Sequence, residues 1–128
     1  MAIEIGMKGE VQTIVEREDT AAEVGSGSLL VYATPCMVAL MEGAACEAIA
    51  PAIGEDQTTV GIELNIQHLS ATPVGHEVRA EATVTAVEGK VITFDVEAFD
   101  EAGLIGKGTH KRVLITAQRF LDKTYSKL

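Results

Sequence analysis

The sequence predicts an α+β domain in which one long central helix is wrapped by a curved antiparallel sheet. Residues 34–49 are almost wholly apolar and carry the start and stop signals of a helix. Beyond residue 60, four runs of alternating apolar and polar residues are separated by short turn sequences. A helix followed by such a meander buries its apolar surface against one face of the sheet, which defines the fold class.

Composition limits the kinds of partner. The 128 residues are 47% hydrophobic, which suits a single domain over 1–128 with one core. A formal net charge of −9 argues against nucleic acid, because phosphate backbones are bound by clustered Lys and Arg. No apolar run approaches the ~20 residues of a membrane span, and no signal peptide is seen. We therefore expect a cytoplasmic protein without nucleic-acid or membrane partners.

The two cysteines are expected to be free thiols. Cys36 and Cys46 lie ten positions apart on the same predicted helix, and a rise of ~1.5 Å per residue separates them by roughly 15 Å. That distance is too long for a disulfide. Free thiols are typical of a reducing cytoplasm.

The predicted helix contains an unusual carboxylate. Thr34 is a good N-cap and Pro35 a good first helical residue. Beyond them only Glu42 and Glu47 are charged, so other structure must surround the helix. Glu42 shares its helical stripe with apolar residues, and such a carboxylate has either a partner or a raised pKa. Both conditions suit an acid/base group, although Glu42 could also reach solvent through a gap.

The segments around the helix have recognisable patterns. A strand is expected around Val11–Val15, and residues 18–29 read as a mobile loop that is first acidic and then Gly/Ser-rich. Residues 60–67 alternate, which places Val60, Ile62, Leu64 and Ile66 on one face and Gly61, Glu63, Asn65 and Gln67 on the other. Further strands are expected over residues 78–86, 92–98 and 104–116, and a short terminal helix or frayed tail after them. The outer face of this sheet has few charges and its edge strands need cover, so we expect a homodimer paired through the sheet.

Two further side chains are candidates for chemistry. His68 continues the apolar face of its strand and points toward the helix, the side on which Glu42 is expected. A lone histidine at a strand end is usually structural, but an imidazole and a carboxylate that face one layer can tune each other's pKa. The Thr34 hydroxyl either caps the helix or lies where it could stabilise an oxyanion beside free N–H groups.

Other positions have weaker signals. Gly61 in a regular strand marks a close approach of another group to the backbone. Cys36 in the first helical turn is either an activated thiol or a buried structural one. His110 precedes Arg112, which with Lys107 and Lys111 could bind a phosphate-bearing ligand or simply form a solvated strand face. The histidines are dispersed and no metal or cofactor motif is found, so no metal and no cofactor are expected.

These segments together resemble a known family. In order and spacing they look like the hotdog-fold acyl-CoA thioesterases, and most of all their fluoroacetyl-CoA thioesterase branch. The resemblance covers roughly residues 10–120. It is carried by the segments 34–42 (TPCMVALME), 60–68 (VGIELNIQH), 71–75 (ATPVG) and 106–112 (GKGTHKR).

The resemblance implies a hotdog fold, a homodimer whose interface holds the acyl-thioester site, and hydrolysis of an acyl-CoA substrate. The family's catalytic Thr, Glu and His correspond to Thr34, Glu42 and His68, and its glycine near the substrate carbonyl to Gly61. We also assign Cys36 and Arg112 to substrate binding. The fluoroacetyl-CoA branch has a phenylalanine lid before the helix, whereas residues 25–28 here are Gly-Ser-Gly-Ser. A broader range of small acyl groups is therefore expected.

The predicted function is hydrolysis of a small acyl-CoA thioester to the free acid and coenzyme A. Glu42 would act as general base or nucleophile, His68 would assist proton transfer, and Thr34 would orient the carbonyl. Two alternatives stay open. One is an acyl-thioester hydratase or dehydratase, and the other is a non-catalytic acyl-CoA-binding dimer.

Overall fold

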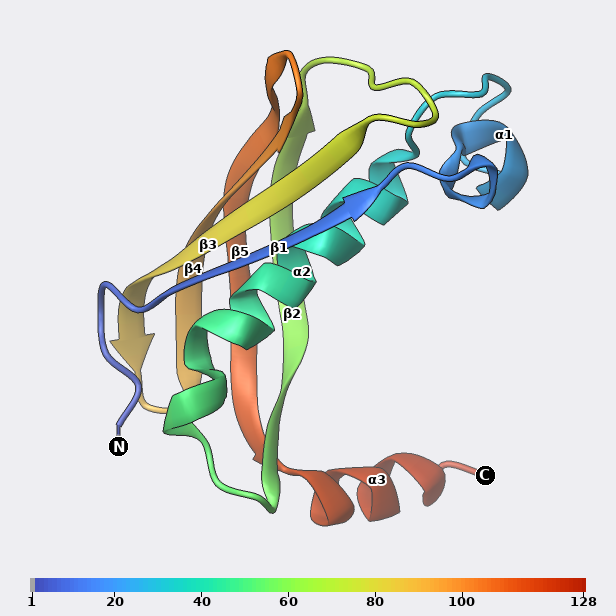
Figure 1. Cartoon of the computed structure of the whole chain (residues 1–128). Helices are drawn as coiled ribbons and strands as arrows, with labels where there is room; N and C mark the ends of the chain where they lie inside the picture. The colour runs from blue at the N-terminus through green and yellow to red at the C-terminus, as the bar shows by residue number, and fades with distance from the viewer. Residues whose placement is uncertain (1) are drawn as a thin grey trace.

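The structure is a computed structural model that describes residues 2–128. It holds a five-stranded antiparallel sheet with one long helix lying across a face of it (Figure 1). The elements in chain order are β1 (Lys8–Ile14), η1 (Arg17–Asp19), α1 (Ala21–Val24), α2 (Thr34–Ile49), η2 (Ala50–Ala52), β2 (Gln57–His68), β3 (Glu77–Glu88), β4 (Val91–Asp100), β5 (Gly103–Thr116) and α3 (Ala117–Tyr125).

The sheet order is β1-β3-β4-β5-β2, which leaves β1 and β2 as the two edges. α2 packs chiefly against β1 and β3. The core forms where this helix meets the sheet, with Met37, Met41 and Ile49 of α2 buried against Phe94 and Ile105. The predicted α+β fold, with a long helix against an antiparallel sheet, is confirmed.

The start of α2 differs from the prediction by one residue. Ala33 is the N-cap and Thr34 is the first helical residue, with Pro35 in the first turn. No side chain caps the helix. The Thr34 hydroxyl is therefore free to bond elsewhere, which matters for the site described below.

A bulge in β2 changes which side chains face the helix. The β2–β5 register pairs Gly61 with Arg112 but Glu63 with Lys111, so one extra residue, Ile62, is inserted in β2. Paired residues share a face of the sheet. Gly61 therefore faces α2 together with Leu64 and His68, and the prediction that placed it on the opposite face was wrong. An inserted residue reverses the alternation, which a period-two pattern cannot show.

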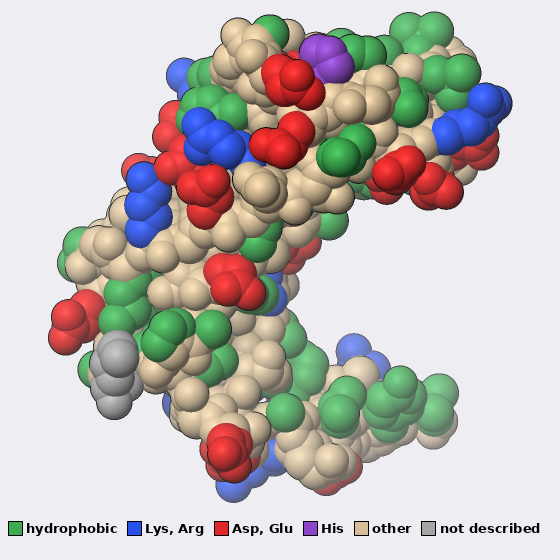
Figure 2. Space-filling model, in the orientation of Figure 1, with side chains coloured by type: hydrophobic (Ala, Val, Ile, Leu, Met, Phe, Trp, Pro, Cys, Tyr) green, Lys and Arg blue, Asp and Glu red, His purple; other side chains and the backbone are tan. Residues whose placement is uncertain are grey.

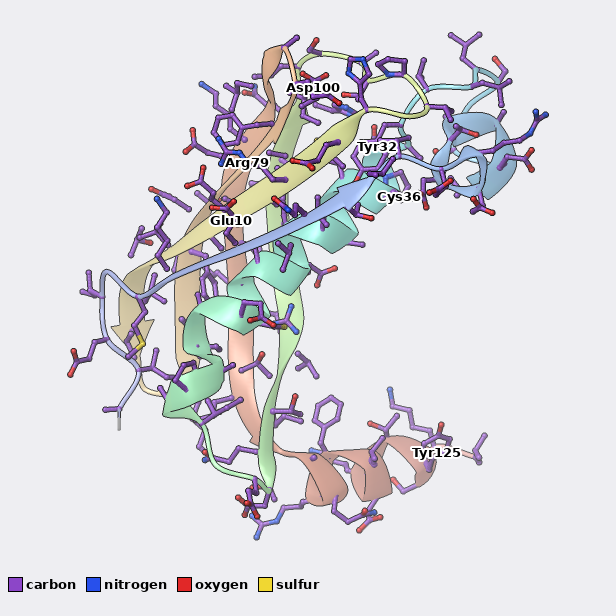
Figure 3. All side chains as sticks on the ribbon, viewed as in Figure 1. Glu10, Tyr32, Cys36, Arg79, Asp100 and Tyr125 are labelled. Carbon is purple, nitrogen blue, oxygen red and sulfur yellow. The ribbon has the colours of Figure 1, made fainter. Side chains whose placement is uncertain are left out.

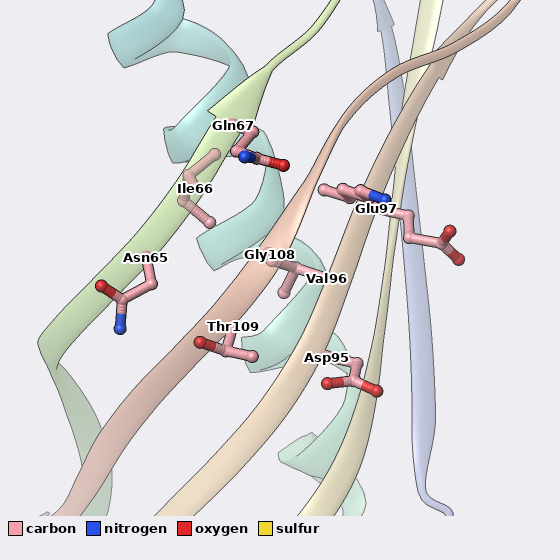
Figure 4. Close-up of a pocket in the computed structure, with 9 residues that line it drawn as sticks. Asn65, Ile66, Gln67, Asp95, Val96, Glu97, Gly108 and Thr109 are labelled. Atoms are coloured by element: carbon pink, nitrogen blue, oxygen red, sulfur yellow. The ribbon is translucent and has the colours of Figure 1, made fainter.

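The outer face of the sheet is more polar than expected. Its middle carries a groove of about 690 Å³ (Figure 4). Polar side chains dominate the lining of this groove, among them Asn65, Gln67, Asp95, Glu97, Lys107 and Thr109. Edge strand β2 also carries exposed apolar side chains, with Ile62 54% and Leu64 43% exposed.

The segment before α2 is ordered rather than a mobile loop. Two short helices, η1 and α1, occupy most of residues 17–24. A β-bridge joins Thr20 to Tyr32, and Thr20 is fully buried. These contacts bring the Gly/Ser-rich stretch back beside the start of α2.

The chain ends in an amphipathic helix that stands away from the body. α3 follows β5 directly and projects from the sheet (Figure 2). Phe120, Leu121 and Tyr125 are all substantially exposed on it. Within residues 2–128, no helix has both the length and the apolar character needed to cross a membrane.

The close approach of β1 to α2 predicts opposite effects for two glycine substitutions. A Cβ at Gly9 would overlap the backbone of Ala44 and Ala48, so Gly9→Ala is expected to lower the free energy of unfolding by about 1–3 kcal/mol. A Cβ at Gly43 would meet only Val11 Cγ2, at 3.8 Å. Gly43→Ala should therefore stabilise the protein by about 0.5–1 kcal/mol through helix propensity. Urea denaturation of both variants checks the pair, and a Gly9→Ala variant as stable as Gly43→Ala would contradict this packing.

Candidate active site

Thr34 and His68 form a hydrogen-bonded pair at one end of the protein. Thr34 opens α2 and His68 ends β2, and the Thr34 Oγ1 to His68 Nδ1 distance is 2.8 Å. The His68 Nε2 atom is buried and has no hydrogen-bond partner in the part of the chain that the structure describes. Burial lowers the pKa of this imidazole below its usual 6.5. A neutral imidazole in contact with a hydroxyl can accept its proton.

This pair lines a small cavity. The cavity has a volume of about 280 Å³ and is bordered by Tyr32, Leu69 and Ser70 in addition to Thr34 and His68. Ser26, from the Gly/Ser stretch, also lines it. The Gly/Ser stretch is thus beside the Thr34–His68 pair.

Glu42 belongs to a second cluster, in the middle of the sheet. Arg112 Nη1 donates to Glu42 Oε2 over 3.1 Å. The same guanidinium donates from Nε to Thr59 Oγ1 over 2.8 Å and from Nη2 to the Thr59 carbonyl over 3.0 Å. Arg112 is buried, whereas Glu42 is partly exposed. A guanidinium that donates from all three of its nitrogens therefore holds the carboxylate in one position.

His110 completes this cluster as a neutral imidazole. It is fully buried and stacks on Phe94. Its Nδ1 donates to the Glu63 carbonyl over 2.8 Å, and its Nε2 accepts from Arg112 Nη1 over 3.1 Å, because a carbonyl can only accept and a guanidinium can only donate. Burial lowers the His110 pKa, in agreement with this tautomer.

Gly61 lies directly over the cluster. A Cβ built at this position would come 2.6 Å from Glu42 Oε2 and 3.1 Å from His110 Cε1. Any side chain here would displace the carboxylate. The predicted close approach at Gly61 is therefore present, and the approaching group is Glu42.

The structure thus brings the predicted site residues together in two groups rather than one. Thr34 with His68 forms the first group, and Glu42 with Gly61 forms the second. Thr34 and Glu42 are eight positions apart on α2, about 12 Å along the helix axis. Glu42 bonds to Arg112 and not to His68, so the expected meeting of Glu42 and His68 does not occur within one protomer.

Cys36 lies apart from both groups. It borders a different cavity with Tyr32 and Leu40, and Figure 3 shows Tyr32 and Cys36 together near the end of β1. Burial raises the Cys36 pKa, which opposes an activated thiolate. Both cysteines are free thiols, as expected.

Arg112 does not form a cationic group with its neighbours. Arg112 faces α2, whereas Lys111 pairs with Glu63 at 3.9 Å and Lys107 lines the outer groove. Successive strand residues point to opposite faces, so the expected cluster of the three is divided by the sheet. Arg112 contacts Glu42 and Thr59 instead of standing open to a phosphate.

His110 is the functional candidate that the sequence reading left without a role. The alternation of residues along the strand already indicates that His110 lies on the same face of β5 as Arg112, together with Gly106 and Gly108. Without the neighbouring strands, nothing distinguished that face as the one toward α2.

The two neutral histidines predict an acid-labile fold. His68 and His110 both have lowered pKa values in the folded state, so the unfolded chain binds more protons once the pH falls below about 6.5. Stability is expected to decrease as the pH is lowered from 7 to 5. Urea midpoints across this range measure the loss, which should be smaller in His68→Gln. An equal loss in the variant would show that His68 does not contribute.

Residues 15–118 match the model of the fluoroacetyl-CoA-specific thioesterase family. A fluoroacetyl-CoA thioesterase of Streptantibioticus cattleyicolor is 37% identical over 97 residues, which span 76% of this chain and 70% of that protein.

Solved structures agree. A fluoroacetyl-CoA-specific thioesterase superposes with a TM-score of 0.93 at 29% identity, over 100% of this chain and 99% of that one. A variant of that enzyme has been solved with fluoroacetate and CoA. A hot-dog-like protein from Thermanaerovibrio acidaminovorans has a TM-score of 0.87 at 20% identity, over 98% and 93% of the two chains, and shares the fold. The chain therefore has the hotdog fold and belongs to the fluoroacetyl-CoA-specific thioesterase family.

Proposed function

We propose that this protein hydrolyses a small acyl-CoA thioester, using Thr34 and His68 of one protomer with Glu42 and Gly61 of a second. Membership of the family supports thioester hydrolysis. The observation that carries the assignment to these residues is the 2.8 Å contact between the Thr34 hydroxyl and the imidazole of His68.

We assign the role of base to His68. Its pKa is lowered by burial, so the imidazole is neutral near pH 7 and can take a proton. The nearest proton is that of Thr34. As it moves to His68, the Thr34 oxygen attacks the thioester carbonyl, the C–S bond breaks, and the thiolate leaves with the proton from the imidazole. Water then hydrolyses the acyl-threonine and completes the reaction.

Glu42 suits a positioning role better than that of base. Its carboxylate is bonded to Arg112, and a charge-assisted bond of this kind fixes the direction of the carboxylate. Because Gly61 has no side chain, Glu42 Oε2 lies directly against its backbone. This revises the sequence-based hypothesis, in which Glu42 was the general base or the nucleophile.

A homodimer would bring the two groups together. β2 is an unpaired edge strand with Ile62 and Leu64 exposed, and such an edge is suited to pairing with another strand. Two copies related by a two-fold axis pair this strand antiparallel. The Gln57 end of one β2 then lies beside the His68 end of the other. In this arrangement the partner's Gly61 lies closer to Thr34 and His68 than the Gly61 of the same protomer does.

The substrate range is tested with acyl-CoAs of graded length. Released thiol, followed with a thiol-reactive dye, is expected for short acyl groups, including acetyl, because no phenylalanine lid borders the cavity. Thiol release also separates hydrolysis from hydration or dehydration, which leave the thioester intact. Binding of acyl-CoA without thiol release would instead support the non-catalytic acyl-CoA-binding alternative.

Mixing two inactive variants tests the shared site. In a dimer of one His68→Ala and one Glu42→Gln protomer, one of the two sites has both residues intact. Mixed subunits should therefore recover about a quarter of the wild-type activity, because half of the dimers are mixed. If the mixture is as inactive as the separate variants, the site does not cross the interface.

A further inference from the structure

We propose that a pocket between α3 and β5, the α3 pocket, binds the phosphate-bearing nucleotide of the acyl-CoA substrate. This inference rests on the proposed function, since it names where the far end of that substrate lies. The pocket has a volume of about 240 Å³. The residues that carry the argument are Lys90, Arg119 and Lys123 on its charged side and Val113, Ile115 and Phe120 on its apolar side.

The charge of this pocket is opposite to that of the protein. The chain has 10 Lys and Arg against 19 Asp and Glu. Among the described residues, the cations in ion pairs with carboxylates are Lys8, Arg17, Arg79, Lys111 and Arg112.

Three of the remaining cations, Lys90, Arg119 and Lys123, line the α3 pocket, and no Asp or Glu lines it. In an acidic protein, unpaired cations collected in one place indicate a site for a multiply charged anion.

The apolar side of the pocket suits a purine ring. Phe120 is 40% exposed there, and the strand side chains of Val113 and Ile115 border the same space. The other two phenylalanines are engaged, since Phe94 is buried and Phe99 is covered by Arg79. A free aromatic face beside cations is the combination that binds a base together with its phosphates. Figure 2 shows α3 standing off the body with Lys and Arg side chains at its borders.

The pocket is within reach of the second cluster. Its lining continues β5 from Val113 to Thr116, directly after Arg112. At ~3.3 Å per residue, these positions lie roughly 3–13 Å from Arg112 along the strand. Val113 and Ile115 point to the face of the sheet opposite Arg112, so a flexible pantetheine arm would pass round the Thr116 end of β5 to join the pocket to the second cluster. The acyl group would then lie beside Gly61 and Glu42 while the nucleotide occupies the α3 pocket.

Kinetics on whole and truncated substrates test this placement. The triple variant Lys90→Ala/Arg119→Ala/Lys123→Ala is compared with wild type on acetyl-CoA and on acetyl-pantetheine, which lacks the nucleotide. The ratio of the acetyl-CoA KM to the acetyl-pantetheine KM is expected to rise at least tenfold in the variant. The matched control Lys107→Ala/Lys127→Ala removes two unpaired cations outside the pocket and should leave the ratio within about twofold. An unchanged ratio in the triple variant would overturn the proposal.

A binding measurement keeps this inference separate from the proposed function. Titration calorimetry with adenosine 3′,5′-bisphosphate, which has no thioester, should show binding to wild-type protein and at least tenfold weaker binding to the triple variant. Equal binding by both, or none by wild type, would refute the pocket even if the protein hydrolyses acyl-CoA. Absence of hydrolysis with retained, pocket-dependent binding would refute the proposed function alone.

Discussion

His68→Ala is expected to reduce kcat/KM for the best acyl-CoA substrate by about 10²–10⁴, the range for loss of a general base. Among residues 2–128, the imidazole is the group bonded to the Thr34 hydroxyl, so its removal leaves that hydroxyl without this proton acceptor. His76→Ala is the matched control. It removes another histidine, from the turn before β3, and should keep the activity within about twofold.

Variants of Thr34 test whether its hydroxyl acts together with His68. Thr34→Val removes the hydroxyl and should cost about as much as His68→Ala, whereas Thr34→Ser should keep most of the activity. If the two groups act as a unit, the double variant will be no worse than either single one. Additive losses would show that Thr34 and His68 act independently, and full activity of His68→Ala would contradict its role as base.

Arg112→Met is expected to lower both stability and activity. The change leaves Glu42 and the Thr59 carbonyl without their partner, and breaking a partly buried ion pair should cost about 2–4 kcal/mol of unfolding free energy. This loss of unfolding free energy is near the low end of what breaking a buried ion pair costs, because Glu42 is partly exposed to solvent. Hydrolysis should also weaken, because the carboxylate beside Gly61 is no longer held.

The adjacent residue supplies the control. Lys111→Met removes a cation one position away, on the opposite face, whose 3.9 Å pair with Glu63 is exposed. Lys111→Met should lower the free energy of unfolding by less than about 0.5–1 kcal/mol. Urea denaturation and steady-state kinetics of the two variants measure the difference. Equal stability of Arg112→Met and Lys111→Met would mean that the Arg112 network does not stabilise the fold.

Much of the fold was predictable because local patterns dominate it. The helix α2 starts one residue before its predicted start and otherwise lies where it was predicted, since its apolar surface and flanking prolines are local signals. The strands follow the alternating runs, and the turns fall at Gly75, Gly89 and Gly103, all with positive φ. The short helices η1 and α1 were missed, because their order depends on contacts such as the Thr20–Tyr32 bridge.

The sequence by itself determined the fold class and the family, and it supplied the candidate residues of the site, because these depend on local periodicity and on motifs within single segments. Only the tertiary structure decided how Thr34, His68, Glu42 and Gly61 divide into two groups. The bulge at Ile62 turned Gly61 toward α2, and the β2–β5 register set Arg112 and His110 beside Glu42. Such placements depend on strand pairing between residues distant in the chain, and no local pattern records that pairing.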